Sequence, residues 1–263
     1  MIEYKNKKVA ITGYRGYIGS ALYNRLKDDE CDVTCVDIDL SDGDEIYQFF
    51  DGKDFDILFH LAASPVPYTI SKEQKLNDIL LEREVNSSSV LYLYEALKNT
   101  DTKVVFLSST NVFGEVDFDI VDENTADKPQ SLWASHKILA ENYLNILFDD
   151  SICLRIPNVY GVDDINSNSI LKPIINKVIN LALKNKKYYV LGCKEKTTIS
   201  DVWNIISENL NNIPIDYNNK ELNMMETRSY TANYKMFNDL TGWYPKFDIK
   251  DGICDTISKL EEI

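Results

Sequence analysis

Three glycines spaced three residues apart, at the junction of a strand-like run and a helix-like run, constrain this chain more than any other feature. Residues 8–12 (KVAIT) favour a strand, and residues 17–27 (YIGSALYNRLK) have the apolar spacing of a helix. Gly13, Gly16 and Gly19 lie at this junction. In such a turn the first glycine allows the tight bend, the second lets backbone N–H groups approach a pyrophosphate, and the third lets the helix pack closely on the sheet. The pattern predicts a dinucleotide-binding turn, although strand-to-helix turns without a ligand also need glycines.

An acidic residue follows at the position where a dinucleotide-binding fold needs one. Asp37 ends the second strand-like run, residues 33–37 (VTCVD), and lies 24 residues after Gly13. A carboxylate there accepts hydrogen bonds from both ribose hydroxyls and repels a 2′-phosphate, and no arginine directly follows Asp37. We therefore expect NAD rather than NADP, bound by Gly13, Tyr14, Arg15, Gly16, Tyr17, Ile18, Gly19, Asp37, Ile38, Asp39 and Leu40.

The chain continues as an alternation of strand-like and helix-like segments. Strand-like runs fall at residues 56–63, 103–109 and 151–156, and helical spacing falls near residues 44–50, about 72–98 and 131–148. The runs at 56–63 and 103–109 are nearly continuous in apolar residues, which is typical of parallel strands buried on both faces. Strands separated by helices of this length predict right-handed βαβ units, and hence an α/β fold with a doubly wound parallel sheet, the Rossmann fold.

After residue 160 the composition of the sequence changes, because asparagine-rich loops separate the predicted elements. These elements are a helix near 169–185, a short strand at 188–192, a helix near 198–210 and a final helix after Pro245. We expect residues 1–162 to form the NAD-binding Rossmann domain. Residues 163–263 are expected to form a smaller, reduced α/β substrate-binding lobe.

Composition argues against several other classes of protein. The 28 Lys and Arg residues against 42 Asp and Glu residues give a net charge of −14, which repels nucleic acid and anionic membranes. No apolar run approaches the roughly 20 residues that span a membrane, and the first residues do not resemble a signal peptide. Five scattered cysteines form no CxxC pair and no ligand cluster with the two histidines, so we expect no metal site and reduced thiols in a cytoplasmic protein.

Several motifs occur in the order typical of one family. They are GxxGxxG at 13–19, HLAA at 60–63, VNSSSVLYLYEA at 85–96, FLSSTNVFG at 106–114, LRIPNVYG at 154–161 and LTGWYPKFDIKDGICDTI at 240–257. Together they resemble the NAD-dependent epimerase/dehydratase family, an extended branch of the short-chain dehydrogenase/reductase superfamily whose members modify nucleotide sugars. The resemblance implies that Leu61, Ala62, Ala63, Asn86, Lys137 and Pro157 line the cofactor cleft. It also implies that the substrate is met by Ser109, Thr110, Asn111, Asn158 and Arg228.

The chain departs from the family at the residue that the resemblance makes most important. In the family, a Tyr-x-x-x-Lys pair takes the proton of the sugar hydroxyl as hydride leaves carbon, and the lysine also holds the nicotinamide ribose. Lys137 is in register here, but the residue four before it is Trp133. An indole N–H only donates, so Trp133 cannot serve as a base. Either Ser109, Tyr68 or His136 carries the proton instead, or the protein binds NAD without turnover.

Two further departures bear on the reaction and on the substrate. Thr110 and Asn111 stand where family dehydratases carry an Asp-Glu pair, which disfavours carboxylate-driven loss of water. The family's RDFxxVxDV segment, which supplies much of the sugar-nucleotide pocket, is absent. Arg228 is placed either to meet a diphosphate or to form a surface ion pair.

These patterns lead to two main hypotheses from different classes. The first is an NAD-dependent epimerase or reductase that acts on a nucleotide sugar, with Ser109 polarising the oxygen and Lys137 positioning the ribose. The second is a catalytically silent NAD-binding subunit or sensor, which Trp133 and the shortened lobe favour. A structural protein without NAD is the remaining alternative. The resemblance also implies a homodimer that pairs through the helices near 72–98 and 131–148.

Overall fold

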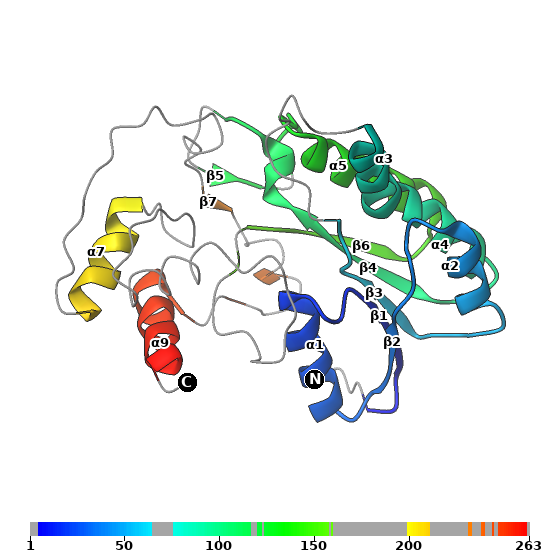
Figure 1. Ribbon diagram of the computed structural model, residues 1–263, viewed down its shortest axis with the longest axis horizontal. Helices are drawn as coiled ribbons and strands as arrows, with labels where there is room; N and C mark the ends of the chain where they lie inside the picture. The colour runs from blue at the N-terminus through cyan, green and yellow to red at the C-terminus, as the bar shows by residue number, and fades with distance from the viewer. Residues whose placement is uncertain are drawn as a thin grey trace. The chain divides into compact units, whose positions relative to one another are not determined.

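The computed structural model describes residues 5–64, 76–116, 120–122, 124–157, 159, 199–210, 231–232, 238–239, 244 and 247–261 (Figure 1). The chain divides into two compact units. The first holds the described residues up to Val112 together with 129–156, and the second holds the described residues of 113–128 and those from Pro157 onward. The predicted domain boundary at 162/163 lies outside the described residues and stays a prediction.

A five-stranded parallel sheet forms the centre of the first unit. Its strands are β1 (Lys8–Thr12), β2 (Asp32–Val36), β3 (Ile57–His60), β4 (Lys103–Ser109) and β6 (Ser151–Ile156), in the order β2-β1-β3-β4-β6. The chain runs from β1 to β2 and then returns to the other side of β1, so the strand order reverses between β1 and β3. In open α/β sheets, ligands bind beyond the carboxyl ends of the strands at such a reversal. The sheet confirms the predicted fold class.

Helices cover both faces of this sheet, as a doubly wound fold requires. One face is covered by α1 (Tyr17–Asp28), and the other by α2 (Gly43–Phe50), α4 (Ser89–Leu97) and α5 (Leu132–Leu147) (Figure 1). Side chains alternate along β1, so Val9 and Ile11 pack in one cluster with Leu26 of α1. Ala10, which lies between them, belongs to the larger cluster on the opposite face. That cluster includes Phe50 of α2, Leu93 of α4 and Leu144 of α5.

The stretch predicted as one helix near 72–98 is divided. The described part consists of α3 (Leu76–Arg83), a π-helical segment η1 (Glu84–Ser88) and α4. Two hydroxyl groups form hydrogen bonds with carbonyl groups four residues back: Ser87 Oγ donates to the carbonyl of Arg83 at 2.8 Å, and Ser89 Oγ to that of Val85 at 2.8 Å. Such back-bonding distorts a helix, and π-helical turns occur frequently at functional sites. The spacing of apolar residues does not indicate such a π-helical segment, so it was not predicted from the sequence.

The second unit contains short strands and two described helices. Strand β5 (Ile120–Val121) pairs in parallel with β7 (Thr231–Ala232), and α7 (Ile199–Asn209) packs against α9 (Ile249–Glu261). The helices agree with those predicted near 198–210 and after Pro245, whereas the helix near 169–185 and the strand at 188–192 lie outside the described residues. In the part of the chain that the structure describes, no helix is both long and apolar enough to cross a membrane.

Candidate functional site

The glycine turn after β1 packs tightly against the chain that follows β3. Gly13 has a positive φ of 69°, and a Cβ added there would lie 2.7 Å from the Cα of Ala62. A Cβ added at Gly19 would lie 2.1 Å from the carbonyl oxygen of Gly13, so neither position accepts a side chain without movement of backbone. The N–H of Gly16 donates to the Gly13 carbonyl at 2.9 Å. Gly16 is also the N-cap residue of α1, and no side chain caps this end of the helix. The N-terminus of α1 therefore has the form of an anion-binding turn.

A buried threonine ties the ends of β1 and β3 together. Thr12 Oγ1 accepts hydrogen bonds from the backbone N–H groups of Leu61 and Ala62, both at 3.1 Å, and lies 2.8 Å from Nδ1 of His60. Because its oxygen already accepts two hydrogen bonds, the hydroxyl proton of Thr12 points to Nδ1. Thr12 thus fixes both the glycine turn and the predicted cofactor segment 61–63, of which Ala63 is exposed.

This assignment extends through His60 to the helix layer. With Nδ1 as the acceptor, Nε2 carries the ring proton and donates to Ser89 Oγ at 3.2 Å, and Ser89 in turn donates to the carbonyl of Val85 in the π-helical segment. Burial, and secondarily the charge of Lys137, lowers the pKa of His60 to about 3. His60 is therefore a neutral structural residue. Sequence reasoning missed Thr12 and Ser89, and only the histidine of the HLAA motif pointed toward this chain of hydrogen bonds.

Asp37 follows β2 and already has a cationic partner. Arg15 Nη2 lies 2.5 Å from Asp37 Oδ2, and the guanidinium also lies over the ring of Tyr14, 5.1 Å from its centroid. Both members of the ion pair are largely exposed. The sequence placed both residues at the cofactor but did not predict this contact, because they are 22 positions apart. The contact places a positive charge beside the carboxylate that was predicted to select NAD.

The residues that follow Asp37 are used mainly within the fold. Leu40 is buried in the core and Ile38 packs against that core. Asp39 accepts hydrogen bonds from the hydroxyl and the backbone N–H of Ser41, which lower the pKa of its carboxyl group. These three predicted cofactor residues therefore shape the turn before α2, and their contact with a cofactor stays a prediction.

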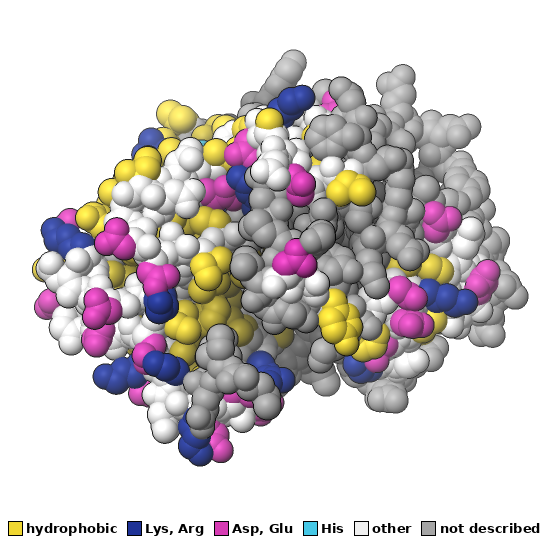
Figure 2. Space-filling view, turned by 180° about the vertical axis from the view of Figure 1, so that it is seen from behind, with side chains coloured by type: hydrophobic (Ala, Val, Ile, Leu, Met, Phe, Trp, Pro, Cys, Tyr) yellow, Lys and Arg dark blue, Asp and Glu magenta, His cyan; other side chains and the backbone are white. Residues whose placement is uncertain are grey.

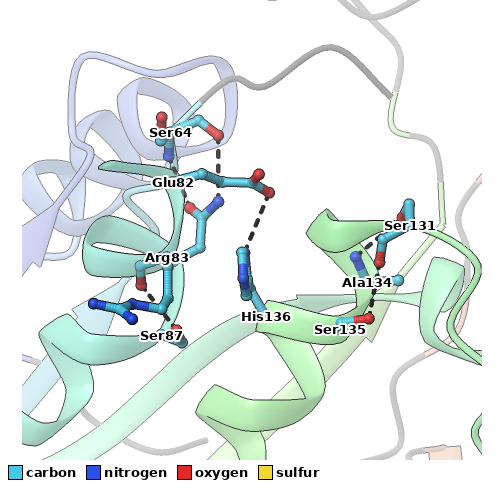
Figure 3. A network of polar contacts seen from close by, with 9 residues as sticks. Ser64, Glu82, Arg83, Ser87, Ser131, Ala134, Ser135 and His136 are labelled. Atoms are coloured by element: carbon cyan, nitrogen blue, oxygen red, sulfur yellow. Dashed lines mark hydrogen bonds and ion pairs between the residues drawn. The ribbon is translucent and has the colours of Figure 1, made fainter. Parts of the chain in front are cut away.

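Asn86 lies in the π-helical segment and binds the chain after β3. Its Oδ1 accepts from the backbone N–H of Ser64 at 2.8 Å, and its Nδ2 donates to the Ser64 carbonyl at 3.4 Å (Figure 3). Asn86 is buried, and both the oxygen and the nitrogen of its side-chain amide form hydrogen bonds with the backbone of Ser64. This contact fixes the segment that follows the predicted cofactor residues 61–63.

Ser109 is the last residue of β4 and lies at the carboxyl edge of the sheet. Its Oγ accepts a hydrogen bond from the N–H of Asn111 at 3.2 Å, which leaves the hydroxyl proton to donate elsewhere. Thr110 is buried, and both Thr110 and Asn111 belong to the short 3₁₀ helix η2 (Thr110–Phe113). The structure therefore brings Ser109 to the edge where the turn after β1 also lies.

Lys137 is, with His60, one of two buried ionisable groups of the first unit whose pKa is strongly lowered. It is buried on α5, and its Nζ donates to the carbonyl of Leu107 in β4 at 2.8 Å. The ammonium lies 4.5 Å from the ring centroid of Phe106 and 5.1 Å from that of Trp133. Burial lowers the pKa of Lys137 to about 7, against the opposing effect of Glu141. Such a perturbed lysine beside Ser109's strand is typical of a functional site.

Trp133 and Lys137 occupy one side of α5, one turn apart. The helix begins after Ser131, whose hydroxyl accepts from the N–H of Ala134 at 3.2 Å (Figure 3). Its first turn therefore presents Trp133 against Lys137, as residues four apart on a helix are neighbours. The indole contributes a ring face to the lysine and offers no proton acceptor.

A buried ion pair holds α5 to the sheet beneath these residues. Glu141 accepts from Arg155 of β6 through Nε at 3.0 Å and Nη2 at 2.6 Å, and Ser108 also donates to it. This bidentate geometry pairs both oxygens of the Glu141 carboxylate with Arg155. Lys137 therefore shares no direct ion pair with Glu141, although both face the same side of the helix.

The remaining predicted site residues stay predictions. Pro157 directly follows β6 and is exposed, whereas Tyr68, Asn158 and Arg228 lie outside the described residues. Among the described residues there is no group of His, Cys, Asp and Glu side chains that could hold a metal ion.

Comparison with known proteins gives a consistent result. A protein of Methanocaldococcus jannaschii that is provisionally named a UDP-glucose 4-epimerase is 23% identical, over 93% of this chain and 95% of that protein. The structure of a UDP-glucose 4-epimerase from Thermotoga maritima with UDP-glucose matches with a TM-score of 0.80 at 18% identity, and covers 97% of this chain and 99% of that one. A UDP-N-acetylglucosamine 4-epimerase from Methanobrevibacter ruminantium M1 in complex with UDP-N-acetylmuramic acid matches with a TM-score of 0.78 at 23% identity, and covers 98% and 100%.

The sequence profile of the NAD dependent epimerase/dehydratase family matches residues 9–202, which include the glycine turn, Ser109 and Lys137. This match extends over more than half of the chain. The chain therefore belongs to the NAD dependent epimerase/dehydratase family.

Proposed function

We propose that this protein uses NAD to carry out an epimerase- or reductase-type hydride transfer on a nucleotide sugar. The observation that carries the proposal is that the Gly13 turn, Ser109 and the buried Lys137 all adjoin strands of one sheet. The first belongs to the loop after β1, the second ends β4, and the third reaches β4 from α5. Family membership and the UDP-sugar enzymes that match over nearly the whole chain support the same reading.

The residues of the glycine turn fit a dinucleotide. Gly13 and Gly19 leave no room for side chains, a Cβ at Gly16 would lie 3.1 Å from the Gly13 carbonyl oxygen, and the turn presents the uncapped start of α1, which suits a pyrophosphate. When bound, NAD supplies an acceptor for a hydride. In the proposal Ser109 donates its hydroxyl proton to the sugar oxygen, and Lys137 donates N–H groups to the nicotinamide ribose.

The choice of NAD over NADP rests on Asp37 and is opposed by Arg15. A carboxylate after β2 favours ribose hydroxyls, whereas an exposed guanidinium 2.5 Å from it can meet a 2′-phosphate. Calorimetric titration with both dinucleotides tests the balance. We expect tighter binding of NAD, a loss of that preference in Asp37→Ala, and weaker NADP binding in Arg15→Ala. Tighter binding of NADP by the wild-type protein would contradict the proposal.

Turnover is tested by proton NMR of the purified protein with NAD and a pool of UDP-, dTDP-, GDP- and CDP-sugars. New anomeric signals, lost in Ser109→Ala and Lys137→Ala, are expected. A matched control is Ser20→Ala, because Ser20 lies on α1 and bonds only within that helix. If the wild-type protein binds NAD but leaves every sugar unchanged, the proposed reaction is wrong.

One observation favours a second candidate, a silent NAD-binding subunit or sensor. The side chain that faces Lys137 from one turn earlier is the indole of Trp133, which cannot accept the proton of a sugar hydroxyl. In this case NAD would bind without turnover, and Trp133→Tyr, which restores a phenol, would be expected to restore new sugar signals.

A further inference from the structure

A carboxylate without a hydrogen-bonding partner is buried one helical turn before Asn86. Glu82 of α3 is fully buried, and neither of its carboxylate oxygens receives a hydrogen bond from the described residues. Removing a charged carboxylate from water is costly unless another group compensates for it. The neighbourhood of Glu82 must therefore supply a proton or a cation.

The group that faces Glu82 is the imidazole of His136 on α5. Its Nδ1 lies 3.4 Å from Glu82 Oε1, and it too has no hydrogen bond among the described residues (Figure 3). The distance is longer than a well-formed hydrogen bond, as is common for catalytic contacts before a substrate is bound. The two side chains approach each other from different helices, so no local sequence pattern indicates the pair.

Both members of the pair are close in sequence to residues proposed to act in catalysis or to shape the cofactor segment. His136 precedes Lys137 and lies three residues after Trp133, and Glu82 is four residues before Asn86. The side chain of His136 is 12% exposed, so the imidazole is not closed off on every side. A carboxylate that accepts the Nδ1 proton fixes the tautomer and leaves the lone pair of Nε2 free to accept a proton.

We infer that Glu82 and His136 form the proton-accepting pair of the proposed reaction, in place of the missing phenol. The inference rests on the proposed function. NAD, when bound, would accept the hydride from the sugar C–H bond; His136 would accept the O–H proton at Nε2, directly or through one water, as the C=O bond forms. The imidazolium is then stabilised by the Glu82 carboxylate. Return of the hydride and of this proton restores the alcohol and the neutral imidazole.

Other groups near Trp133 are less suited to this role. Lys137 donates to the Leu107 carbonyl and lies close to two aromatic rings. Its proposed role is to donate hydrogen bonds to the nicotinamide ribose. Ser109 has no base among its described partners, because the group bonded to its oxygen is the N–H of Asn111. His60 has both ring nitrogens occupied by Thr12 and Ser89.

The tautomer of His136 can be measured without any substrate. The chain has two histidines, so the full-length protein labelled with ¹⁵N-histidine gives two imidazole systems, which His60→Gln and His136→Gln assign. We expect opposite tautomers, with the proton of His60 on Nε2 and that of His136 on Nδ1. Glu82→Met should move the His136 proton to Nε2, whereas Glu82→Gln, which keeps an acceptor, should not. A proton on Nε2 of His136 in the wild-type protein would overturn the inference.

Kinetics separate this inference from the proposed function. With the sugar that the NMR screen identifies, His136→Gln should lower kcat by about 10²–10⁴-fold and leave the NAD dissociation constant unchanged. Glu82→Met should lower kcat as well, Glu82→Gln should lower it less, and the matched control Glu95→Met on the exposed side of α4 should not. If the wild-type protein turns over and His136→Gln keeps its kcat, the pair is only a contact between helices and the proposed function stands. If no sugar is converted at all, the proposed function fails, and this inference fails with it.

Discussion

Burial controls the charge of two ionisable side chains near the predicted catalytic residues. His60 is enclosed between Thr12 and Ser89, and Lys137 lies between β4 and the Trp133 ring. In both cases burial disfavours the charged form, so each pKa is lower than in an exposed side chain. The two groups nevertheless have different consequences, because histidine is normally neutral near pH 7 and lysine is not.

His60 should make the protein sensitive to mild acid. Its pKa is about 3 in the folded protein and about 6.5 when unfolded, so below pH 6.5 only the unfolded state takes up this proton. The free energy of unfolding should therefore fall with decreasing pH, by about 1.4 kcal/mol per pH unit from this group. Urea unfolding between pH 7 and 5 should show a shallower pH dependence for His60→Gln than for the wild-type protein. Equal slopes would mean that His60 is not buried and neutral.

Lys137 should cost the folded protein stability at neutral pH. Its pKa is about 7 when folded and about 10.5 when unfolded, so the unfolded state binds more protons between these values and stability rises with pH across them. At pH 7 and below, burial of the charged ammonium lowers the free energy of unfolding by its full amount. Lys137→Met, which keeps an unbranched side chain without the charge, should raise the free energy of unfolding at pH 7 by about 2 kcal/mol. Its turnover should be lost, and a variant that unfolds more easily than the wild-type protein would contradict the argument.

At the scale of elements, the junction of β1 and α1 depends on the absence of one side chain. A Cβ at Gly19 would lie 2.1 Å from the backbone oxygen of Gly13, so Gly19→Ala must displace the start of α1. We expect it to abolish NAD binding in calorimetry and to lower stability by about 2 kcal/mol or more. Gly52→Ala is the matched control, since its Cβ meets nothing within 4 Å. It should keep NAD binding and lose only about 1–2 kcal/mol for its positive φ. Normal NAD affinity in Gly19→Ala would show that α1 can shift freely.

Elements with a strong local pattern were predictable, and contacts between distant residues were not. Apolar periodicity placed α1, α5 and the strands of the sheet within one residue, because burial determines that spacing, except that β3 ends three residues before the end of the predicted run 56–63. The strands β5 and β7 are two residues each and pair across 111 positions, so no local pattern marks them. The same holds within the site. Motifs identified Gly13, Ser109 and Lys137, whereas the pairing of Glu82 with His136 depends on how two helices meet.

At the scale of the whole molecule, the helices that carry the proposed catalytic groups also expose apolar side chains. These are Leu76, Leu80 and Leu81 of α3, Leu91 of α4 and Ile146 of α5, of which Ile146 is 77% exposed. Hydrophobic side chains gather on the left of the view in Figure 2, which shows the molecule from behind. Several apolar side chains exposed on the helices of one unit are typical of an interface. Because a net charge of −14 opposes association in general, such a surface needs a specific partner.

A second copy of the chain is the partner that we predict, as the resemblance to the family implied. Light scattering should give twice the chain mass of 30.2 kDa for the wild-type protein, and the single chain mass for the double variant Leu80→Glu/Ile146→Glu. Phe247→Glu, at an exposed apolar side chain of the second unit, is the matched control and should remain a dimer. Since α3 and α5 supply Glu82, His136 and Lys137, dissociation should lower turnover more than NAD affinity. A wild-type mass of one chain at working concentration would exclude the dimer and leave this apolar surface to a different partner.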